Sequence, residues 1–182
     1  SRPNTTSFRK TVITSKPGIG IVAPSGYTFD DAVVQRGIAL LEARGHVVHN
    51  YFDIAKVFQR FGGTDEARLA QLQSAACDPD IEVVVALRGQ YGLTRLLPRI
   101  DFEAMAASGK IFVGFSDFTA FQMGLMAKTG AKSYAGPMLY PDFGATDPVD
   151  FTLDDFWKCL AGPTHRIDVT AQDNPSVEVN GT

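Results

Sequence analysis

Cysteine is scarce in this chain of 182 residues, which holds only Cys77 and Cys159. Two cysteines are too few for the disulfide framework of a small secreted domain, and their scarcity fits a reducing compartment. Long apolar runs are also missing, since no stretch approaches the roughly 18 residues that a membrane helix needs. The first residues are polar, and no apolar segment typical of a secretory signal follows them. We therefore expect a protein that does not span a membrane.

Histidine and clustered basic residues are equally few. The chain has three histidines, and two of them, His46 and His49, flank an expected strand at a spacing that places them on opposite faces. No cysteine or carboxylate accompanies them at a spacing typical of metal ligands, so we expect no metal site. The net charge is −3, from 17 basic and 20 acidic residues without a basic block. Nucleic-acid binding requires clustered Lys and Arg, and no such partner is expected.

The chain does have the composition of a folded core, with 45% hydrophobic residues. Apolar strands alternate with amphipathic helices, and the strands are apolar along most of their length, as is typical of strands covered on both faces. The expected strands span residues 18–23, 47–48, 81–87, 111–115 and 133–135. The expected helices span residues 30–44, 65–77, 93–98 and 117–128. This alternation predicts an α/β domain of three layers, a parallel sheet with helices on both faces.

The character of the sequence changes near residue 140. We expect a lead-in over residues 1–17, an α/β domain over 18–140 and a linker over 141–182. Within the linker, a short helix is expected near 154–162, and extended pieces at 165–170 and 177–179. Its apolar content is too low for a second core, so it resembles the lead-in to a further domain.

The ends of three expected strands carry turns, at residues 24–26, 88–92 and 115–117. Ligands of parallel α/β sheets bind outside the carboxyl ends of the strands, so we expect these turns to converge on one rim. The pattern Gly18-x-Gly20 also matches a loose dinucleotide fingerprint. That pattern lies within the first strand instead of opening a helix, and small residues under a packed helix explain it better.

The turn at 88–92 reads Arg-Gly-Gln-Tyr-Gly and follows a buried strand. Its two glycines allow a tight turn that brings backbone N–H groups close to a ligand. Arg88 or Arg95 offers a guanidinium group to a carboxylate. Spacing alone does not separate this interpretation from an ordinary connection between a strand and a helix.

The segment 114–118 reads Gly-Phe-Ser-Asp-Phe and lies between a buried strand and an amphipathic helix. This is the setting of a nucleophile elbow, in which a sharp turn exposes the serine hydroxyl, here that of Ser116. The helix dipole and the Asp117 N–H would then stabilise an oxyanion. Phe118 replaces the second glycine of the usual elbow, so the motif is incomplete. A second interpretation, that Ser116 only caps the helix, stays open.

An ordered set of segments resembles the LD-carboxypeptidase family of serine peptidases, which includes the microcin-immunity peptidases. The resemblance covers about residues 18–140 and rests on the order and spacing of the segments more than on any one of them. The matching segments are Ile21-Val22-Ala23-Pro24-Ser25-Gly26, Gly62-Gly63-Thr64-Asp65-Glu66-x-Arg68, Arg88-Gly89-x-Tyr91-Gly92-x-x-Arg95-Leu96-Leu97, Asp101, Gly114-Phe115-Ser116-Asp117-x-Thr119-Ala120 and Gly136-Pro137-Met138.

The resemblance implies a flavodoxin-like nucleophile domain in a cytoplasmic enzyme that is usually a homodimer and needs no metal or organic cofactor. The implied substrate is a murein tetrapeptide, from which the enzyme releases the terminal D-alanine during cell-wall recycling. The implied site residues are Ser116 as nucleophile, the backbone N–H groups of Asp117 and of the Gly89–Gln90 turn as oxyanion hole, and Arg88, Tyr91 and Gly92 as substrate contacts.

Two local departures from the family pattern concern Gln90, where the family usually has glycine, and Ala135, where it often has histidine. If position 90 requires a positive φ, glutamine is strained there. Both positions lie in matching regions and bear on how a substrate fits.

The family completes a Ser-Glu-His triad with residues of a C-terminal domain, which would lie beyond Thr182. His165 stands in the polar linker, where the family does not place its base. We therefore expect an N-terminal part of a longer enzyme that is inactive alone, because serine without a base is a poor nucleophile. Two alternatives remain, an immunity-type peptidase that cleaves peptidyl or aminoacyl nucleotide analogues, and a non-catalytic ligand-binding module.

Overall fold

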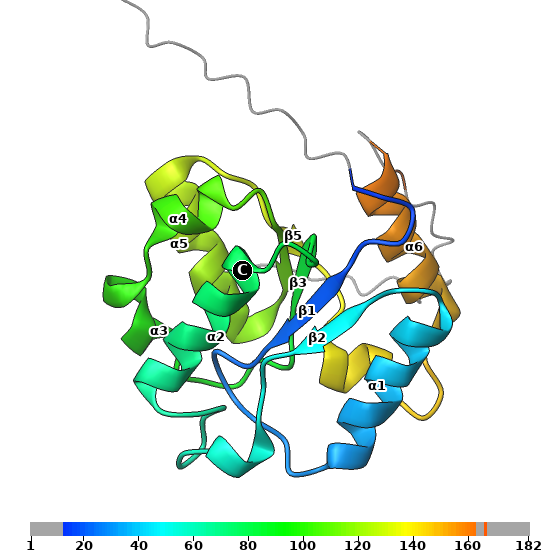
Figure 1. Ribbon diagram of the computed structural model, residues 1–182, viewed down its shortest axis with the longest axis horizontal. Helices are drawn as coiled ribbons and strands as arrows, with labels where there is room; N and C mark the ends of the chain where they lie inside the picture. Colours follow the sequence, from blue (N-terminus) through cyan, green and yellow to red (C-terminus); the bar gives the residue numbers. More distant parts are fainter. Residues whose placement is uncertain (1–12, 163–165, 167–182) are drawn as a thin grey trace, which may run out of the picture.

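A five-stranded parallel sheet forms the centre of the chain in a computed structural model that describes residues 13–162 and 166 (Figure 1). Its strands, in the spatial order β2-β1-β3-β4-β5, are β1 (Ile19–Val22), β2 (Val48–Asn50), β3 (Val83–Ala86), β4 (Ile111–Gly114) and β5 (Tyr134–Ala135). All four neighbouring pairs run parallel. This is the strand order of flavodoxin-like sheets, so the predicted fold class is confirmed.

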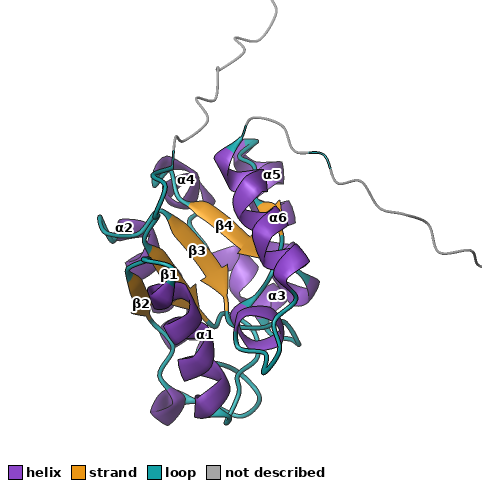
Figure 2. Cartoon of the chain, turned by 90° about the vertical axis from the view of Figure 1, so that its right-hand side faces the viewer, coloured by secondary structure: helices purple, strands orange, loops and turns teal. Residues whose placement is uncertain are grey.

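Helices cover both faces of the sheet, which gives the predicted three layers (Figure 2). One face carries α2 (Asp65–Cys77), α3 (Leu93–Leu96), α4 (Phe102–Ala107) and α5 (Thr119–Thr129). The other carries α1 (Asp31–Ala43), α6 (Asp150–Ala161) and η4 (Leu139–Phe143), a single π-helical turn. Three 3₁₀ turns complete the described elements, η1 (Ile54–Lys56), η2 (Leu97–Arg99) and η3 (Ser116–Phe118).

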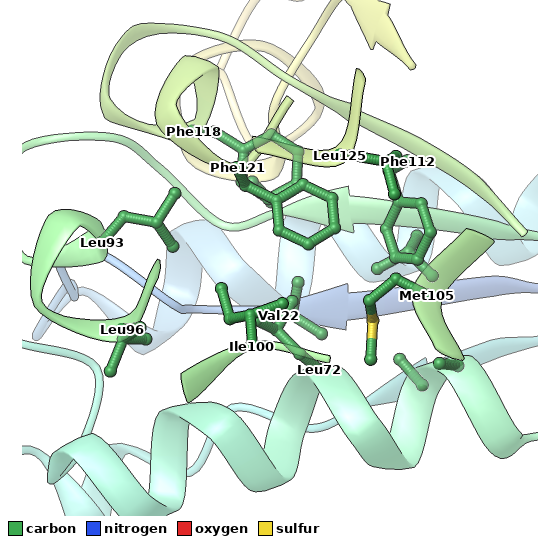
Figure 3. Close-up of a cluster of buried hydrophobic side chains, with 14 of the residues drawn as sticks. Val22, Leu72, Leu93, Leu96, Ile100, Met105, Phe112, Phe118, Phe121 and Leu125 are labelled. Atoms are coloured by element: carbon green, nitrogen blue, oxygen red, sulfur yellow. The ribbon is translucent and has the colours of Figure 1, made fainter. Parts of the chain in front are cut away.

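Two hydrophobic clusters hold the layers together, one on each face of the sheet. Along β3, Val84 and Ala86 belong to the cluster under α2–α5, whereas Val83 and Val85 belong to the cluster under α1 and α6. Figure 3 shows the first cluster, where the ring of Phe121 in α5 lies beside the rings of Phe118 and Phe112. Each fully buried aliphatic side chain contributes roughly 1.5–3 kcal/mol, so a strand that is apolar on both faces is the expected centre of such a sheet.

Helix α6 lies in the stretch expected as a linker, and it begins four residues earlier than the helix expected near 154–162. Leu153, Phe156 and Leu160 point its apolar face into the cluster with α1. The described part of this stretch therefore belongs to the core of this domain. The expected extended pieces lie outside the described residues, except for residue 166.

Helix α4 was not expected from the sequence. Its two buried apolar residues, Phe102 and Met105, are too few to show a helical period, and the Asp101 side chain caps it by accepting a hydrogen bond from the Ala104 N–H at 3.0 Å. The helix expected at 117–128 also differs, because η3 precedes α5. Among the described residues, no helix combines the length and apolar character that a membrane crossing requires.

Candidate active site

The turns that leave β1, β3 and β4 meet at one rim of the sheet, as the sequence predicted. The Gly26 N–H donates a hydrogen bond to the Gly89 carbonyl oxygen at 2.9 Å, which joins the first two turns. A β-carbon on Gly89 would lie 2.7 Å from the β-carbon of Ser116 and 2.8 Å from its Oγ, so the second and third turns are in contact. Only glycine allows this approach.

Ser116 has a φ of 58°, in the left-handed region that non-glycine residues seldom occupy. It follows the extended residue Phe115 and begins η3, so the chain turns sharply between β4 and α5. Neither η3 nor α5 has a side-chain cap, so Ser116 does not serve as the helix cap that the second interpretation required. Gly114 makes the turn possible, because a β-carbon there would lie 2.6 Å from the Phe118 ring.

The turn after β3 uses the left-handed region twice, at Gln90 with a φ of 83° and at Gly92 with a φ of 116°. The condition under which glutamine is strained at position 90 is therefore met. The Gln90 side chain lies against Gly26, where a β-carbon would come within 2.4 Å of its Oε1. The positive φ of Gln90 therefore costs on the order of 1 kcal/mol of strain in the turn that lies beside Ser116.

A pocket of about 440 Å³ opens at this rim. It is lined by Arg88, Gly89, Gln90, Tyr91, Phe115, Ser116, Met138, Tyr140 and Pro141. Five of the expected site residues are among them, and Asp117 and Gly92 are not. The sequence did not single out Tyr140 or Pro141, because nothing local marks them as neighbours of residues 88–91.

The two arginines considered for a carboxylate differ in position. The Arg88 guanidinium lies over the Tyr140 ring, 4.6 Å from its centroid, and donates from Nη1 to the Tyr27 carbonyl oxygen at 3.3 Å. Arg95 instead lies 3.0 Å from Asp65 in an exposed ion pair. Arg88 therefore lines the pocket, and Arg95 does not.

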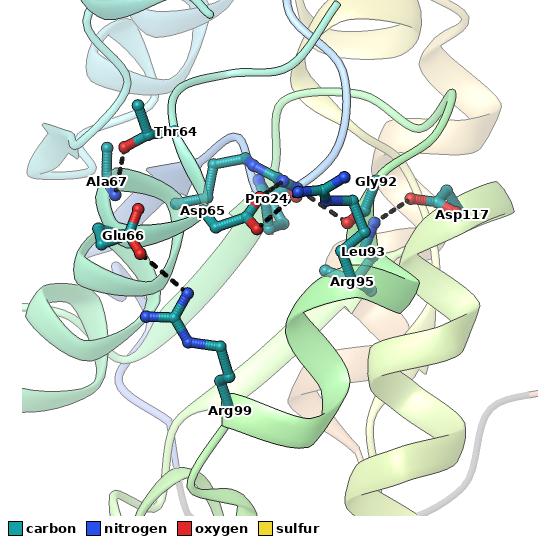
Figure 4. A network of polar contacts seen from close by, with 11 residues as sticks. Pro24, Thr64, Asp65, Glu66, Ala67, Gly92, Leu93, Arg95, Arg99 and Asp117 are labelled. Atoms are coloured by element: carbon teal, nitrogen blue, oxygen red, sulfur yellow. Dashed lines mark hydrogen bonds and ion pairs between the residues drawn. The ribbon is translucent and has the colours of Figure 1, made fainter.

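A polar network centred on α2 joins the turns at this rim (Figure 4). The fully buried Arg68 of α2 donates from Nη1 to the carbonyl oxygens of Pro24 and Gly92, at 2.6 and 2.9 Å, and from Nη2 to Asp65 at 2.6 Å. Arg95, with a smaller contribution from Arg68, holds the pKa of the Asp65 carboxyl below its usual range. Burial lowers the pKa of Arg68, and Asp65 opposes that shift. Arg68 therefore ties the exit of β1 to the turn after β3.

Asp117 makes a second tie between the turns. Its Oδ2 accepts a hydrogen bond from the Leu93 N–H at 3.1 Å, at the start of α3. Its own backbone nitrogen would lie 3.4 Å from a β-carbon on Gly89, so the Asp117 amide borders the point where the turns meet. The arrangement therefore brings the turn after β3 against the Ser116 hydroxyl and the Asp117 amide.

The described histidines do not line this pocket. His46 is buried, with Nδ1 2.8 Å from the Pro17 carbonyl oxygen, and burial lowers its pKa. His49 Nδ1 lies 2.6 Å from Asp78. The sequence suggested no carboxylates near the histidines at metal-ligand spacing, but the fold brings Asp80 close to His49 and Asp78. The potential ligand atoms of these three residues lie within 4.8 Å of one another. His165 lies outside the described residues.

The family resemblance is confirmed by comparison with known sequences. A family model described as the LD-carboxypeptidase N-terminal domain matches residues 19–136. The chain is 34% identical to the microcin C7 self-immunity protein MccF of Escherichia coli over 126 residues, which is 69% of this chain and 37% of that protein. It is 31% identical to the murein tetrapeptide carboxypeptidase of Pseudomonas aeruginosa over 121 residues, 66% of this chain and 39% of that protein.

Solved structures of carboxypeptidases and of MccF also match this chain. The muramoyltetrapeptide carboxypeptidase from Oxalobacter formigenes superposes with a TM-score of 0.79 at 46% identity, over 88% of this chain and 53% of that one. MccF without ligand superposes with a TM-score of 0.77 at 30% identity, over 82% and 46%. The chain thus spans about half the length of these solved relatives. Because the family model matches most of its residues, the chain belongs to the LD-carboxypeptidase family and carries the family's N-terminal domain.

Proposed function

We propose that this chain is the nucleophile-bearing part of a serine LD-carboxypeptidase that releases the terminal D-alanine from murein tetrapeptides. The contact between Gly89 and the strained Ser116 carries the proposal, because it places the turn after β3 beside an exposed hydroxyl and the Asp117 amide. The substrate class comes from the relatives, two of which are named as carboxypeptidases of murein or muramoyl tetrapeptides.

In the proposed reaction, the Ser116 oxygen attacks the carbonyl carbon that joins the L-centre of a diamino acid to D-alanine. The N–H groups of Asp117 and of the Gly89–Gln90 turn donate hydrogen bonds to the oxyanion. The C–N bond then breaks, the nitrogen of D-alanine gains a proton, and free D-alanine leaves. Water hydrolyses the acyl-serine ester and restores the hydroxyl.

We assign Arg88 to the free carboxylate that marks the substrate's C-terminus. It is the single cationic side chain among the described residues that line the pocket. Tyr140 and the Tyr27 carbonyl hold the guanidinium in place, and arginine can bind a carboxylate through two parallel hydrogen bonds. Tyr91, which is 68% exposed, would contact the peptide at the mouth of the pocket.

The general base lies elsewhere in the proposed enzyme. The described residues that line the pocket include no His, Asp or Glu. A serine hydroxyl that nothing deprotonates is a poor nucleophile, so the 182 residues alone should have little or no peptidase activity. The proposal places the Glu and His of the triad in the remainder of a longer, cytoplasmic and homodimeric enzyme, as the family resemblance implies.

The test is release of D-alanine from a murein tetrapeptide by the intact protein, whose mass is first measured against the 19.7 kDa of this chain. Ser116→Ala should lower kcat by about 10⁴-fold or more. Ser108→Ala, which removes a hydroxyl bonded to the Met105 carbonyl oxygen outside the pocket, is the matched control and should leave kcat unchanged. Full activity of Ser116→Ala, or normal rates from the 182 residues alone, would contradict the proposal.

An immunity-type activity is the second candidate. Phe115 and Tyr91 expose 41% and 68% of their surface at the rim, where a nucleobase could stack. MccF, the relative with this role, has been solved with aspartyl sulfamoyl adenosine. Among the solved relatives, the higher identity to the Oxalobacter carboxypeptidase, 46% against 31% for MccF in this complex, supports the murein substrate. If the intact protein cleaves an aminoacyl sulfamoyl adenosine but releases no D-alanine from the tetrapeptide, the immunity-type activity becomes the first candidate.

A fluorophosphonate probe separates either enzyme from a non-catalytic binding module. Such a probe reacts with activated serines, so labelling of the intact protein that disappears in Ser116→Ala supports a nucleophile. An intact protein that binds the tetrapeptide but is neither labelled nor active would be a binding module.

A further inference from the structure

One peptide group in the turn after β3 is held from both sides by charged side chains. The Gly92 carbonyl oxygen accepts a hydrogen bond from Arg68 Nη1 at 2.9 Å, and the Leu93 N–H of the same peptide group donates to Asp117 Oδ2 at 3.1 Å (Figure 4). A trans peptide is planar, and its C=O and N–H point in opposite directions. The guanidinium and the carboxylate therefore fix both the position and the tilt of this group.

The Arg68 end of this arrangement is rigid. Its side chain is fully buried and also donates to the Pro24 carbonyl and to Asp65, while the guanidinium lies 4.6 Å from the centroid of the Phe61 ring. A buried guanidinium is stable only where several acceptors surround it, so Arg68 cannot swing away without losing all of them. It sets the position of residue 92 relative to the exit of β1.

The Asp117 end is attached to the candidate nucleophile itself. Asp117 follows Ser116 directly, and its backbone N–H is one half of the proposed oxyanion hole. Its side chain holds Leu93, three residues after Gln90 in the turn that supplies the other half. The distance between the two halves therefore depends on the contact between the Asp117 carboxylate and Leu93.

The turn at residues 88–92 has an unfavourable backbone conformation that needs stabilising contacts. Gln90 and Gly92 both have positive φ, and glycine at residues 89 and 92 adds conformational freedom that must be suppressed. Oxyanion-hole donors act only when they are held in place before the reaction, since reorganisation during the reaction costs rate.

We propose that Asp117 and Arg68 are positioning residues that align the two halves of the oxyanion hole through the Gly92–Leu93 peptide group. The Asp117 carboxylate is thus assigned to neither general-base catalysis nor substrate binding. The inference rests on the proposed function, since it concerns the same site. It also predicts a structural signature that exists whether or not that function is correct.

The kinetic test compares Asp117→Ala and Asp117→Asn in the intact protein. Asp117→Ala should lower kcat for D-alanine release by about 10²-fold, the effect of losing one oxyanion donor, with little change in KM. Asp117→Asn should recover much of that loss, because its amide oxygen can still accept the Leu93 N–H bond. The matched control is Asp101→Ala, which removes an equivalent bond to the Ala104 N–H and should lower only the melting temperature.

The spectroscopic test follows the Leu93 amide proton by NMR in the same proteins. A hydrogen bond to a carboxylate is strong, so the Leu93 resonance should move upfield in Asp117→Ala, which removes the acceptor, but not in Asp101→Ala. It should also move upfield in Arg68→Lys, because the bond from Arg68 to the Gly92 carbonyl polarises the same peptide group. An unmoved Leu93 resonance in Asp117→Ala would overturn the inference, as would a kcat loss no larger than that of Asp101→Ala. If Ser116→Ala keeps full activity while the Leu93 resonance shifts as expected, the proposed function fails and the structural link stands.

Discussion

Gly89 and Ser116 lie so close that a β-carbon on Gly89 would be 2.7 Å from the β-carbon of Ser116. Gly89→Ala should therefore push the two turns apart, lowering stability by about 1–3 kcal/mol and kcat by about 10²-fold. Gly130→Ala is the matched control, because a φ of 73° at the end of α5 strains alanine outside the pocket. D-alanine release and thermal melting check both variants. Equal kcat values in the two would show that the contact has no catalytic role.

Gln90 offers a direct measure of strain in the turn. Its φ of 83° disfavours any side chain, so Gln90→Gly should be about 1 kcal/mol more stable than Gln90→Ala. The alanine variant serves as the matched control, since it removes the glutamine side chain but keeps the strained backbone. Urea denaturation of both variants gives the difference. Equal stability would mean that the turn relaxes when residue 90 changes.

Arg88 should determine substrate affinity more than reaction rate. Hydrogen bonds to a charged group contribute about 1.5–3 kcal/mol, so Arg88→Gln should raise KM about 10- to 100-fold and leave kcat nearly unchanged. Arg99→Gln is the control, because it removes an arginine paired with Glu66 at 3.0 Å outside the pocket. A tetrapeptide amidated at its C-terminus should abolish the difference between wild type and Arg88→Gln. A fall in kcat alone would contradict a role in carboxylate binding.

Much of the fold could be predicted because its signals are local. The apolar run at 83–87, which follows Ile81 and Glu82, predicts a strand buried on both faces, and Asp30 caps α1 through the Val33 N–H, as its position suggested. Helix α4 escaped prediction because two apolar residues do not define a period. The extent of α6 was underestimated because its acidic residues mask the spacing of Leu153 and its apolar neighbours.

The candidate site was predictable only where its parts follow strands. The rule that ligands bind at the carboxyl ends of parallel strands was enough to bring residues 88–92 and 115–117 together. It could not place Tyr140, whose approach to Arg88 depends on the path of the chain through η4. Nor could it predict that Arg68 is a fully buried cation, because three of its acceptors come from different segments.

The apolar face of α6 gives a test of domain organisation. Leu153 is only 1% exposed and packs in the cluster with α1, so Leu153→Ala should destabilise the protein by about 2–5 kcal/mol. Phe151→Ala, at a site 57% exposed, is the matched control and should change stability by less than about 0.5 kcal/mol. Urea denaturation measures both. A Leu153→Ala variant as stable as wild type would mean that α6 is not part of the folding unit.

Asp78 should make stability depend on acid. Hydrogen bonds from Tyr51 and His49 lower the pKa of its carboxyl to about 2, whereas the same carboxyl in an unfolded chain should have a pKa of ~3.9. A depressed pKa stabilises the fold at pH values above the unfolded pKa, and this contribution disappears as pH falls through the folded pKa. The gap in unfolding free energy between wild type and Asp78→Asn should therefore be constant above about pH 5 and shrink toward pH 2.

Tyr51→Phe sharpens this test, because it removes the largest cause of the shift and keeps the carboxylate. Its acid dependence should lie between those of wild type and Asp78→Asn, with its transition moved to higher pH than in wild type. Asp80→Asn removes a neighbouring exposed carboxylate, and its gap to wild type should not follow this pattern. Urea denaturation between pH 2 and 7 measures all four proteins. A gap between wild type and Asp78→Asn that stays constant down to pH 2 would mean that Asp78 gains no net stabilisation from Tyr51 and His49.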